Sequence, residues 1–125
     1  MFESISFQVT LPASDIERAK AWYEATLGLQ PAEEGEFGVA WYDTGGVRFM
    51  LYESEFAGTN KATAASLTAP DFDGAMELLR TRGAVFDHVE FGEFKTVDGV
   101  LALPDGRKAA WVKDSEGNIL AITSE

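Results

Sequence analysis

The strongest constraint on the fold is an internal repeat, in which the second half of the chain follows the pattern of the first. With a shift of 56 residues, the helix-forming segment that starts at Asp15 falls on the one that starts at Asp71. With a shift of 71 residues, DTGGVRFMLY falls on DSEGNILAIT, so that Asp43 matches Asp114. Such self-similarity indicates two copies of one supersecondary unit, each of which would leave an apolar face uncovered on its own.

The first copy of the pattern begins with a strand and a helix. Apolar and polar residues alternate over residues 5–11, which predicts a strand with Phe7 on its core face, under the helix. The segment PASDIERAKAWYEATLGL then carries an apolar stripe at helical spacing. We expect Ser14 or Asp15 to cap the start of this helix and Gly28 to cap its end.

The rest of the first copy is predicted to be a β-hairpin. Two apolar segments, 37–42 and 47–53, flank the dipeptide Gly45-Gly46, which is typical of a two-residue hairpin turn. The preceding residues, 30–36, are expected to form one more short strand or a loop.

The second copy repeats this order. AASLT predicts a short strand, and a helix is expected from Phe72 to a stop at Gly83. Glycine-containing turns separate the strands that follow, which are VFDHVEFGEF, GVLALPDG, RKAAWVKD and NILAIT. We predict modules at residues 1–56 and 63–125 of a single domain, joined by a linker at 57–62.

Composition and charge narrow the range of functions. The 125 residues include 21 acids and 10 bases, a net charge of −11. This balance argues against nucleic acid and anionic membranes as partners and slightly favours cationic ligands. The absence of cysteine excludes disulfides, thiol nucleophiles and thiolate zinc sites. MFESISF lacks the features of a signal peptide and no apolar run is long enough to span a membrane, so a cytoplasmic protein is expected.

Two segments carry a resemblance to a known family. QVTLPASDIERAKAWYEATLGL and WVKDSEGNILAI resemble the paired βαβββ modules of the vicinal oxygen chelate superfamily, which includes glyoxalase I, extradiol dioxygenases, fosfomycin-resistance enzymes and bleomycin-binding proteins. The resemblance spans nearly the whole chain. It implies an α+β fold in which the modules form a curved mixed sheet, or cup, with the helices on its outer face.

The metal site of this family is not expected here. The resemblance implies that the four metal-ligand positions are Gln8, Met50, Ala64 and Ala121. Gln8 offers one carbonyl oxygen, Met50 a soft thioether, and the alanines nothing, whereas divalent ions need three or four carboxylate or imidazole ligands. We therefore expect no metal and no other cofactor.

No catalytic residue is expected either. The sequence contains no Ser-His-Asp pattern and no glycine-rich phosphate loop. The lone histidine, His88, is expected to be structural or solvated, and acidic pairs such as Glu33-Glu34 are expected to be solvated surface.

A cup without metal is expected to bind a small molecule on aromatic walls. A two-residue turn places Trp41 opposite Met50, and this surface suits flat ligands. Arg48 could hold an anionic ligand or pair with Asp43, and the face of Trp111 stays open because a one-residue shift reverses it. The expected ligand-binding residues are Gln8, Trp41, Arg48, Met50, Tyr52, Ser66 and Trp111.

These expectations favour a metal-independent binding protein that sequesters an aromatic compound, preferably a cation, as a homodimer. One alternative is an enzyme, namely a glyoxalase-like lyase or isomerase or a dioxygenase. Another is a pseudoenzyme without a dedicated ligand. The sequence leaves open whether the cup closes within one chain or across two.

Overall fold

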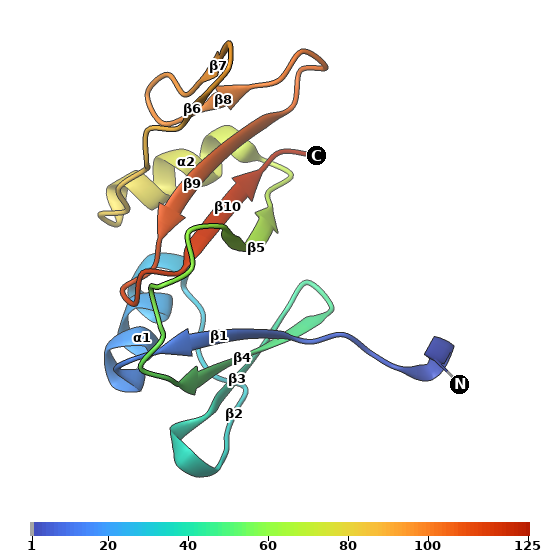
Figure 1. Cartoon of the computed structure of the whole chain (residues 1–125), viewed down its shortest axis with the longest axis vertical. Helices are drawn as coiled ribbons and strands as arrows, with labels where there is room; N and C mark the ends of the chain where they lie inside the picture. The colour runs from blue at the N-terminus through green and yellow to red at the C-terminus, as the bar shows by residue number, and fades with distance from the viewer. Residues whose placement is uncertain (1) are drawn as a thin grey trace.

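The computed structural model describes residues 2–125, which form two four-stranded mixed sheets accompanied by two α-helices (Figure 1). The first sheet has the order β1-β4-β3-β2 and the second the order β5-β10-β9-β8. In each sheet the first strand runs parallel to the last strand of its half, and the other pairs are antiparallel. The α+β class and the repeated strand–helix–strand order are therefore confirmed.

The elements of the first half are β1 (Val9–Ala13), α1 (Ile16–Trp22), β2 (Glu33–Glu34), β3 (Ala40–Thr44) and β4 (Val47–Glu53). A 3-10 turn precedes β1 at Phe2–Ser4, a π-helical turn extends α1 over Tyr23–Leu27, and a 3-10 turn at Glu36–Gly38 precedes β3.

The elements of the second half are β5 (Thr63–Thr68), α2 (Phe72–Thr81), β6 (Glu90–Phe91), β7 (Phe94–Lys95), β8 (Leu101–Ala102), β9 (Lys108–Lys113) and β10 (Ile119–Thr123). Strands β6 and β7 form a separate hairpin. The predicted strands between residues 85 and 103 are much shorter than expected, because their neighbours pair with them only at isolated points such as Phe86 with Val112.

Local sequence explains the start and end of the first helix. The Asp15 carboxylate accepts a hydrogen bond from the Arg18 amide at 3.1 Å, which makes Asp15 the N-cap. At the other end, Gly28 adopts a left-handed conformation with φ 71°, and its amide bonds to the Glu24 carbonyl. Both predicted ends of this helix are confirmed.

The first strand is shorter than predicted. It begins at Val9, and Phe7 is 99% exposed rather than packed under the helix. The physical reason is the register of the parallel pair, which aligns Val9 with Phe49. Strand β4 begins at Val47, only two residues before Phe49, so a longer β1 would have little left to pair with.

The helix-facing sides of the two sheets share one hydrophobic core. From the first half it contains Leu11, Leu51 and Tyr23, and from the second Leu120 and Met76, with further residues from both sheets. On α2 the buried stripe is Phe72, Met76 and Leu79, whereas Leu78 is exposed. Neither helix among residues 2–125 has the length and hydropathy of a membrane span.

The two halves are joined by a docked turn, residues 114–118, which lies between β9 and β10 and beside α1 (Figure 1). Asp114 organises the turn by accepting hydrogen bonds from the Glu116 and Asn118 amides, each at 2.9 Å. Its other oxygen accepts the hydroxyl of Tyr23 at 2.7 Å. Burial, reinforced by the Asp114 charge, raises the pKa of Tyr23, so this hydroxyl stays protonated as the donor.

Glu116 of this turn binds the N-terminus of α1. Its carboxylate accepts hydrogen bonds from the Arg18 guanidinium at 2.8 and 3.0 Å and from the Asp15 amide at 2.9 Å. Burial alone would raise the pKa of Glu116, but the bonds from Arg18, Ser115 and Asp15 outweigh it and hold the pKa at about 2. The carboxylate is therefore ionised at neutral pH, although its side chain is fully buried.

We expect Glu116 to make the stability of the fold depend on acidic pH. Its folded pKa of about 2 lies below the usual value of 4.5, so its contribution is complete above pH 4.5 and is lost as the pH falls toward 2. Substitution of Glu116→Gln should lower the free energy of unfolding by up to about 3 kcal/mol at pH 7 and flatten its fall in acid. Urea unfolding between pH 7 and pH 2 measures both effects.

The matched control for this measurement is Glu55→Gln, because Glu55 is exposed. The control should follow the parent protein over the whole pH range. An unchanged acid profile in Glu116→Gln would contradict the role given to this carboxylate.

A second test uses two glycines of nearly equal backbone conformation. Gly117 has φ 88°, and a Cβ there would lie 2.8 Å from the Cα of Gly58, whereas Gly106 has φ 90° and open space around it. Gly106→Ala should cost about 1–2 kcal/mol for the left-handed backbone alone. Gly117→Ala should cost clearly more in urea unfolding, because two backbones must separate. Equal costs would show that the contact between Gly58 and Gly117 contributes nothing.

Candidate functional site

A row of four side chains crosses the first sheet on the face opposite its helix. The strand register aligns Glu33 with Trp41, Trp41 with Met50, and Met50 with Thr10. The neighbouring residues on these strands, Tyr42 and Leu51 among them, point the other way into the core. The predicted pairing of Trp41 with Met50 is present, and both side chains are half-buried.

Arg48 lies beside this row and is already paired. Its guanidinium donates two hydrogen bonds to Asp43, at 2.8 and 3.0 Å, and one to Glu33 at 2.6 Å. It also lies 5.6 Å from the centre of the Trp41 ring. Of the two predicted roles for Arg48, the structure therefore shows the pairing with Asp43.

The charges around Trp41 have a negative balance, with two carboxylates against one guanidinium. The hydrogen bond from Arg48 lowers the pKa of Asp43, and the bonds to Asp43 and then to Glu33 raise the pKa of Arg48. Asp43 and Arg48 are therefore charged at neutral pH. This face can attract a cation more readily than an anion.

The other predicted residues of the first half lie at the ends of this face. Tyr52 is aligned with Pro12, is half-buried and lies two residues from Met50 on β4, hence on the same face. Gln8 is exposed and lies one residue before β1, outside the sheet. The sequence-based placement of Gln8 inside a strand is therefore corrected by the structure.

A second row crosses the sheet of the second half. The register aligns Ser66 with Ala121 and Ala121 with Trp111, so these three residues share a face, which answers the open question about Trp111. The Trp111 indole donates a hydrogen bond to the Thr63 hydroxyl at 3.2 Å. Because this bond reaches from β9 to β5, the indole crosses the intervening β10.

The four positions that the resemblance assigns to a metal do not fit a divalent ion. Among residues 2–125, no group of three or more histidine, aspartate or glutamate side chains comes close enough to hold one. Gln8 lies on the exposed segment before β1, and Ala121 is a buried residue whose side chain carries no donor atom. His88, the lone histidine, has its Nδ1 3.0 Å from the Thr96 hydroxyl.

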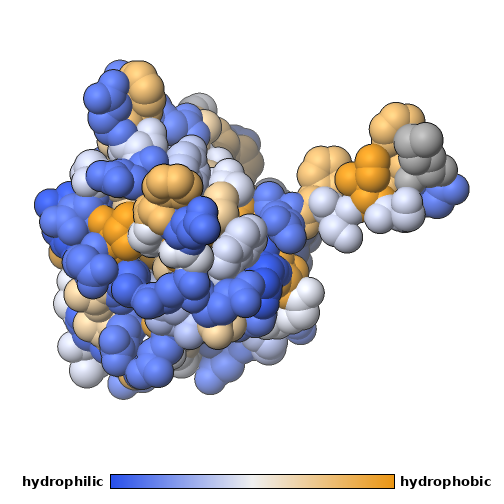
Figure 2. Space-filling model, turned by 90° about the horizontal axis from the view of Figure 1, so that it is seen from below, coloured by the Kyte–Doolittle hydropathy of each residue, from blue (hydrophilic) through white to orange (hydrophobic). Residues whose placement is uncertain are grey.

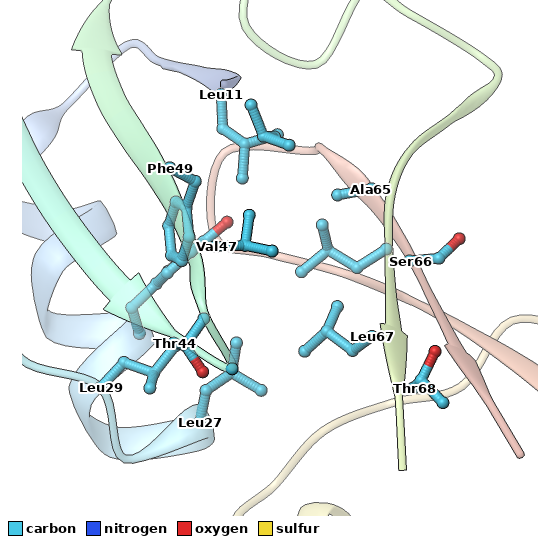
Figure 3. Close-up of a pocket in the computed structure, with 14 residues that line it drawn as sticks. Leu11, Leu27, Leu29, Thr44, Val47, Phe49, Ala65, Ser66, Leu67 and Thr68 are labelled. Carbon is cyan, nitrogen blue, oxygen red and sulfur yellow. The ribbon is translucent and has the colours of Figure 1, made fainter. Parts of the chain in front are cut away.

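The two rows face away from each other within the chain. The opposite, core faces of the two sheets approach one another around an open cavity of about 480 Å³, lined by Leu11, Phe49, Leu67 and Leu120 among others. Figure 3 shows Leu67 pointing into this cavity, whereas Ser66 and Thr68 point away from it. The predicted residues thus form two separate half-sites, one with Trp41 and one with Trp111.

Sequence reasoning missed two members of the first row, Glu33 and Thr10. Glu33 was expected to be solvated surface, but its pairing with β3 brings it beside Trp41 and Arg48. The sequence signal for Glu33 was its place in the short polar segment 30–36. This segment directly precedes the hairpin and can pair with its first strand, β3. Thr10 was expected on this face of the strand but was not included among the ligand-binding residues.

Comparison with solved structures shows the same fold in proteins of low sequence identity. The bleomycin-binding protein complexed with bleomycin has a TM-score of 0.72 at 15% identity, over 98% of this chain and 99% of that chain. Lactoylglutathione lyase from Agrobacterium tumefaciens has a TM-score of 0.72 at 15% identity, over 97% and 93%. A glyoxalase/bleomycin resistance protein from Catenulispora acidiphila has a TM-score of 0.71 at 20% identity, over 98% and 99%.

The sequence comparisons complete this assignment. No curated protein matches the sequence. The model of one protein family matches residues 6–122, which include both strand–helix–strand repeats and both rows described above. The chain therefore belongs to the Glyoxalase/Bleomycin resistance protein/Dioxygenase superfamily.

Proposed function

We propose that this protein is a metal-independent binding protein that sequesters a flat aromatic cation in a cup completed by two copies of the chain. The observation that carries the proposal is the row around Trp41, in which an indole and a thioether lie beside two carboxylates and a single guanidinium. Indole faces attract cations, and the thioether of Met50 makes favourable contacts with aromatic rings. The proposed ligand-binding residues are Gln8, Trp41, Arg48, Met50, Tyr52, Ser66 and Trp111.

The orientation of the two half-sites supports a homodimer. Within one chain the rows of Trp41 and Trp111 point away from a shared core, so neither row can cover a ligand held by the other. A second copy can place its Trp111 row over the Trp41 row of the first, which would enclose a ligand from both sides. Two equivalent cups result from such a symmetric arrangement.

The bleomycin-binding neighbour was solved in complex with bleomycin, which supports ligand capture as an activity compatible with this fold. An enzyme is the second candidate, since a lyase shares the fold equally well. We favour binding because the two rows contain a single carboxylate, that of Glu33, whereas a divalent metal needs three or four such ligands.

Ligand binding should be visible as thermal stabilisation. We expect proflavine, a flat aromatic cation, to raise the melting temperature by several degrees, since a ligand at 100 times its Kd adds about 2.7 kcal/mol of stability. Anthraquinone-2-sulfonate, a flat anion, should have little effect. Bleomycin is a third probe.

The variant that tests the site is Trp41→Ala, which should abolish the shift by proflavine. Phe56→Ala is the control, because Phe56 is exposed on the segment between β4 and β5. If proflavine binds Trp41→Ala as tightly as the parent protein, the ligand does not occupy the proposed row.

Metal removal separates the binding protein from the enzyme. We expect dialysis against EDTA, followed by Mn²⁺, Ni²⁺ or Zn²⁺, to change neither the melting temperature nor the binding of proflavine. Elemental analysis of the purified protein provides the second measurement. A stoichiometric divalent metal whose removal weakens binding or abolishes a lyase activity would overturn the metal-independent assignment.

A further inference from the structure

On the side of β9 away from β10, the chain around residues 86–87 pairs with the middle of the strand. Phe86 forms an antiparallel bridge with Val112, and the Asp87 amide donates a hydrogen bond to the Trp111 carbonyl at 2.8 Å. Because antiparallel strands run in opposite directions, the position after Phe86 lies opposite the position before Val112. Asp87 is therefore the neighbour of Trp111 across the sheet.

The side chain of Asp87 lies on the same face as the indole. Phe86 packs against the hydrophobic core, to which its bridge partner Val112 also belongs. Successive side chains of an extended segment alternate between the two faces, so Asp87 lies on the face opposite the core, with Trp111. Directly opposite side chains on one face have Cβ atoms about 5 Å apart. The half-buried Asp87 side chain therefore stands beside the Trp111 row.

Asp87 takes the place in the second half that Glu33 takes in the first. Glu33 lies opposite Trp41 on the outer segment of its sheet, and Asp87 lies opposite Trp111 in the same way. Each half-site therefore has one carboxylate beside an indole. One carboxylate in each half-site is still too few for a divalent ion, which needs three or four such ligands.

The two carboxylates differ in their partners. The Glu33 carboxylate accepts a hydrogen bond from the Arg48 guanidinium at 2.6 Å, which offsets its charge. Within residues 2–125, the Asp87 side chain forms neither a hydrogen bond nor an ion pair. Lys113 lies two residues from Trp111 on β9, about 7 Å along the strand, and does not pair with Asp87 either. Of the two carboxylates, that of Asp87 is therefore the one free to bind a cation.

The indole of Trp111 extends away from Asp87. Its N–H reaches Thr63 on β5, on the other side of β10, so the ring runs along the sheet. A flat molecule stacked along this ring would meet Asp87 at one end. Hydrogen bonds from a charged N–H group to a carboxylate are about twice as strong as those between neutral groups. A positive N–H group at the end of the ligand is therefore the best partner for Asp87.

The net charge of the chain does not by itself provide such selection. The body of the molecule in Figure 2 presents a largely hydrophilic surface, in keeping with the net charge of −11. This charge attracts cations from a distance, but salt screens exposed charges beyond about 10 Å, so no single place is favoured. Selection of a stacked ligand by its charge requires an unpaired carboxylate beside the ring.

We propose that Asp87 selects the charge of the ligand, by accepting a hydrogen bond from a positively charged N–H group at one end of a flat aromatic molecule stacked on Trp111. This inference rests on the proposed function and narrows its ligand class to aromatic cations with a nitrogen-bound hydrogen at the edge of the ring system. Quaternary cations, which have no such hydrogen, gain only the attraction of the charge. Asp87 is thus a ligand-binding residue in addition to those expected from the sequence.

Three flat ligands of similar size test this selection by fluorescence titration at pH 8. Proflavine is a cation with amino groups, 10-methylacridinium is a quaternary cation, and acridine is uncharged at this pH. Asp87→Asn should weaken proflavine about 10-fold, because a hydrogen bond to a charged group is lost. It should weaken 10-methylacridinium only about 3-fold, as expected for a partly exposed charge pair, and leave acridine unchanged.

The matched control is Glu93→Gln, which changes the net charge by the same amount. Glu93 is exposed at the turn between β6 and β7, so this variant should leave all three affinities unchanged. Glu33→Gln should weaken proflavine less than Asp87→Asn does, because Arg48 already offsets the charge of Glu33.

A charge reversal gives a second test that loss of folding cannot imitate. Asp87→Lys should bind anthraquinone-2-sulfonate about 10-fold more tightly than the parent protein does, and proflavine more weakly than Asp87→Asn does. An affinity for the anion no higher than that of the parent protein would contradict the position of Asp87 beside the ligand.

The outcomes separate this inference from the proposed function. If the parent protein does not bind proflavine, the proposed function fails and the role of Asp87 falls with it. If Asp87→Asn binds proflavine as tightly as the parent protein, the proposed function stands and the role of Asp87 is wrong. Equal weakening of proflavine and acridine would also overturn it, since Asp87 would then affect the shape of the site and not its charge.

Discussion

The relative position of the two sheets depends on the docking of two buried carboxylates at the turn 114–118. Burying a carboxylate is costly unless hydrogen bonds replace the lost water, and here both are fully engaged. Asp114 binds amides of its own turn and the Tyr23 hydroxyl, while Glu116 binds Arg18 and the Asp15 amide. A displacement of one half against the other would remove the Tyr23 hydroxyl from Asp114 and the Arg18 and Asp15 donors from Glu116. The shared core, the cavity and the outward direction of both rows follow from this one fixed position.

The matching turn in the first half of the chain does not bind a helix in this way. The position that matches Glu116 in the first hairpin is Gly45, which has no side chain to bind a helix. Asp43, the match of Asp114, is exposed and bonds to Arg48 of its own hairpin instead. The undocked hairpin leaves space, and its residues Thr44, Gly45 and Val47 line the open cavity. The broken symmetry of the repeat therefore explains why one side of the core is open.

The features that could be predicted from the sequence are those that depend on residues close together in the chain. A two-residue turn fixes the register of its hairpin, so the pairing of Trp41 with Met50 followed from Gly45-Gly46 alone. The exposure of Phe7 could not be predicted, because alternation reports an amphipathic segment but not whether a neighbouring strand reaches it. Glu116 is one acid among 21, and its burial depends on Arg18, which lies 98 residues away in sequence. No residue near Glu116 in the sequence indicates its contact with Arg18.

The net charge of the chain bears on both the proposed dimer and the proposed ligand. A dimer carries twice the net charge of −11, or −22, so its halves repel each other at low ionic strength, and the contact that holds them must be apolar. The Trp41 row, with Glu33 and Asp43, adds negative charge where we propose that the second copy closes over it. A bound cation offsets that charge, so cation binding and association must strengthen each other by the same factor. An anionic ligand would add to this negative charge and oppose closure of the cup. The acidic net charge of the chain therefore favours a cationic ligand.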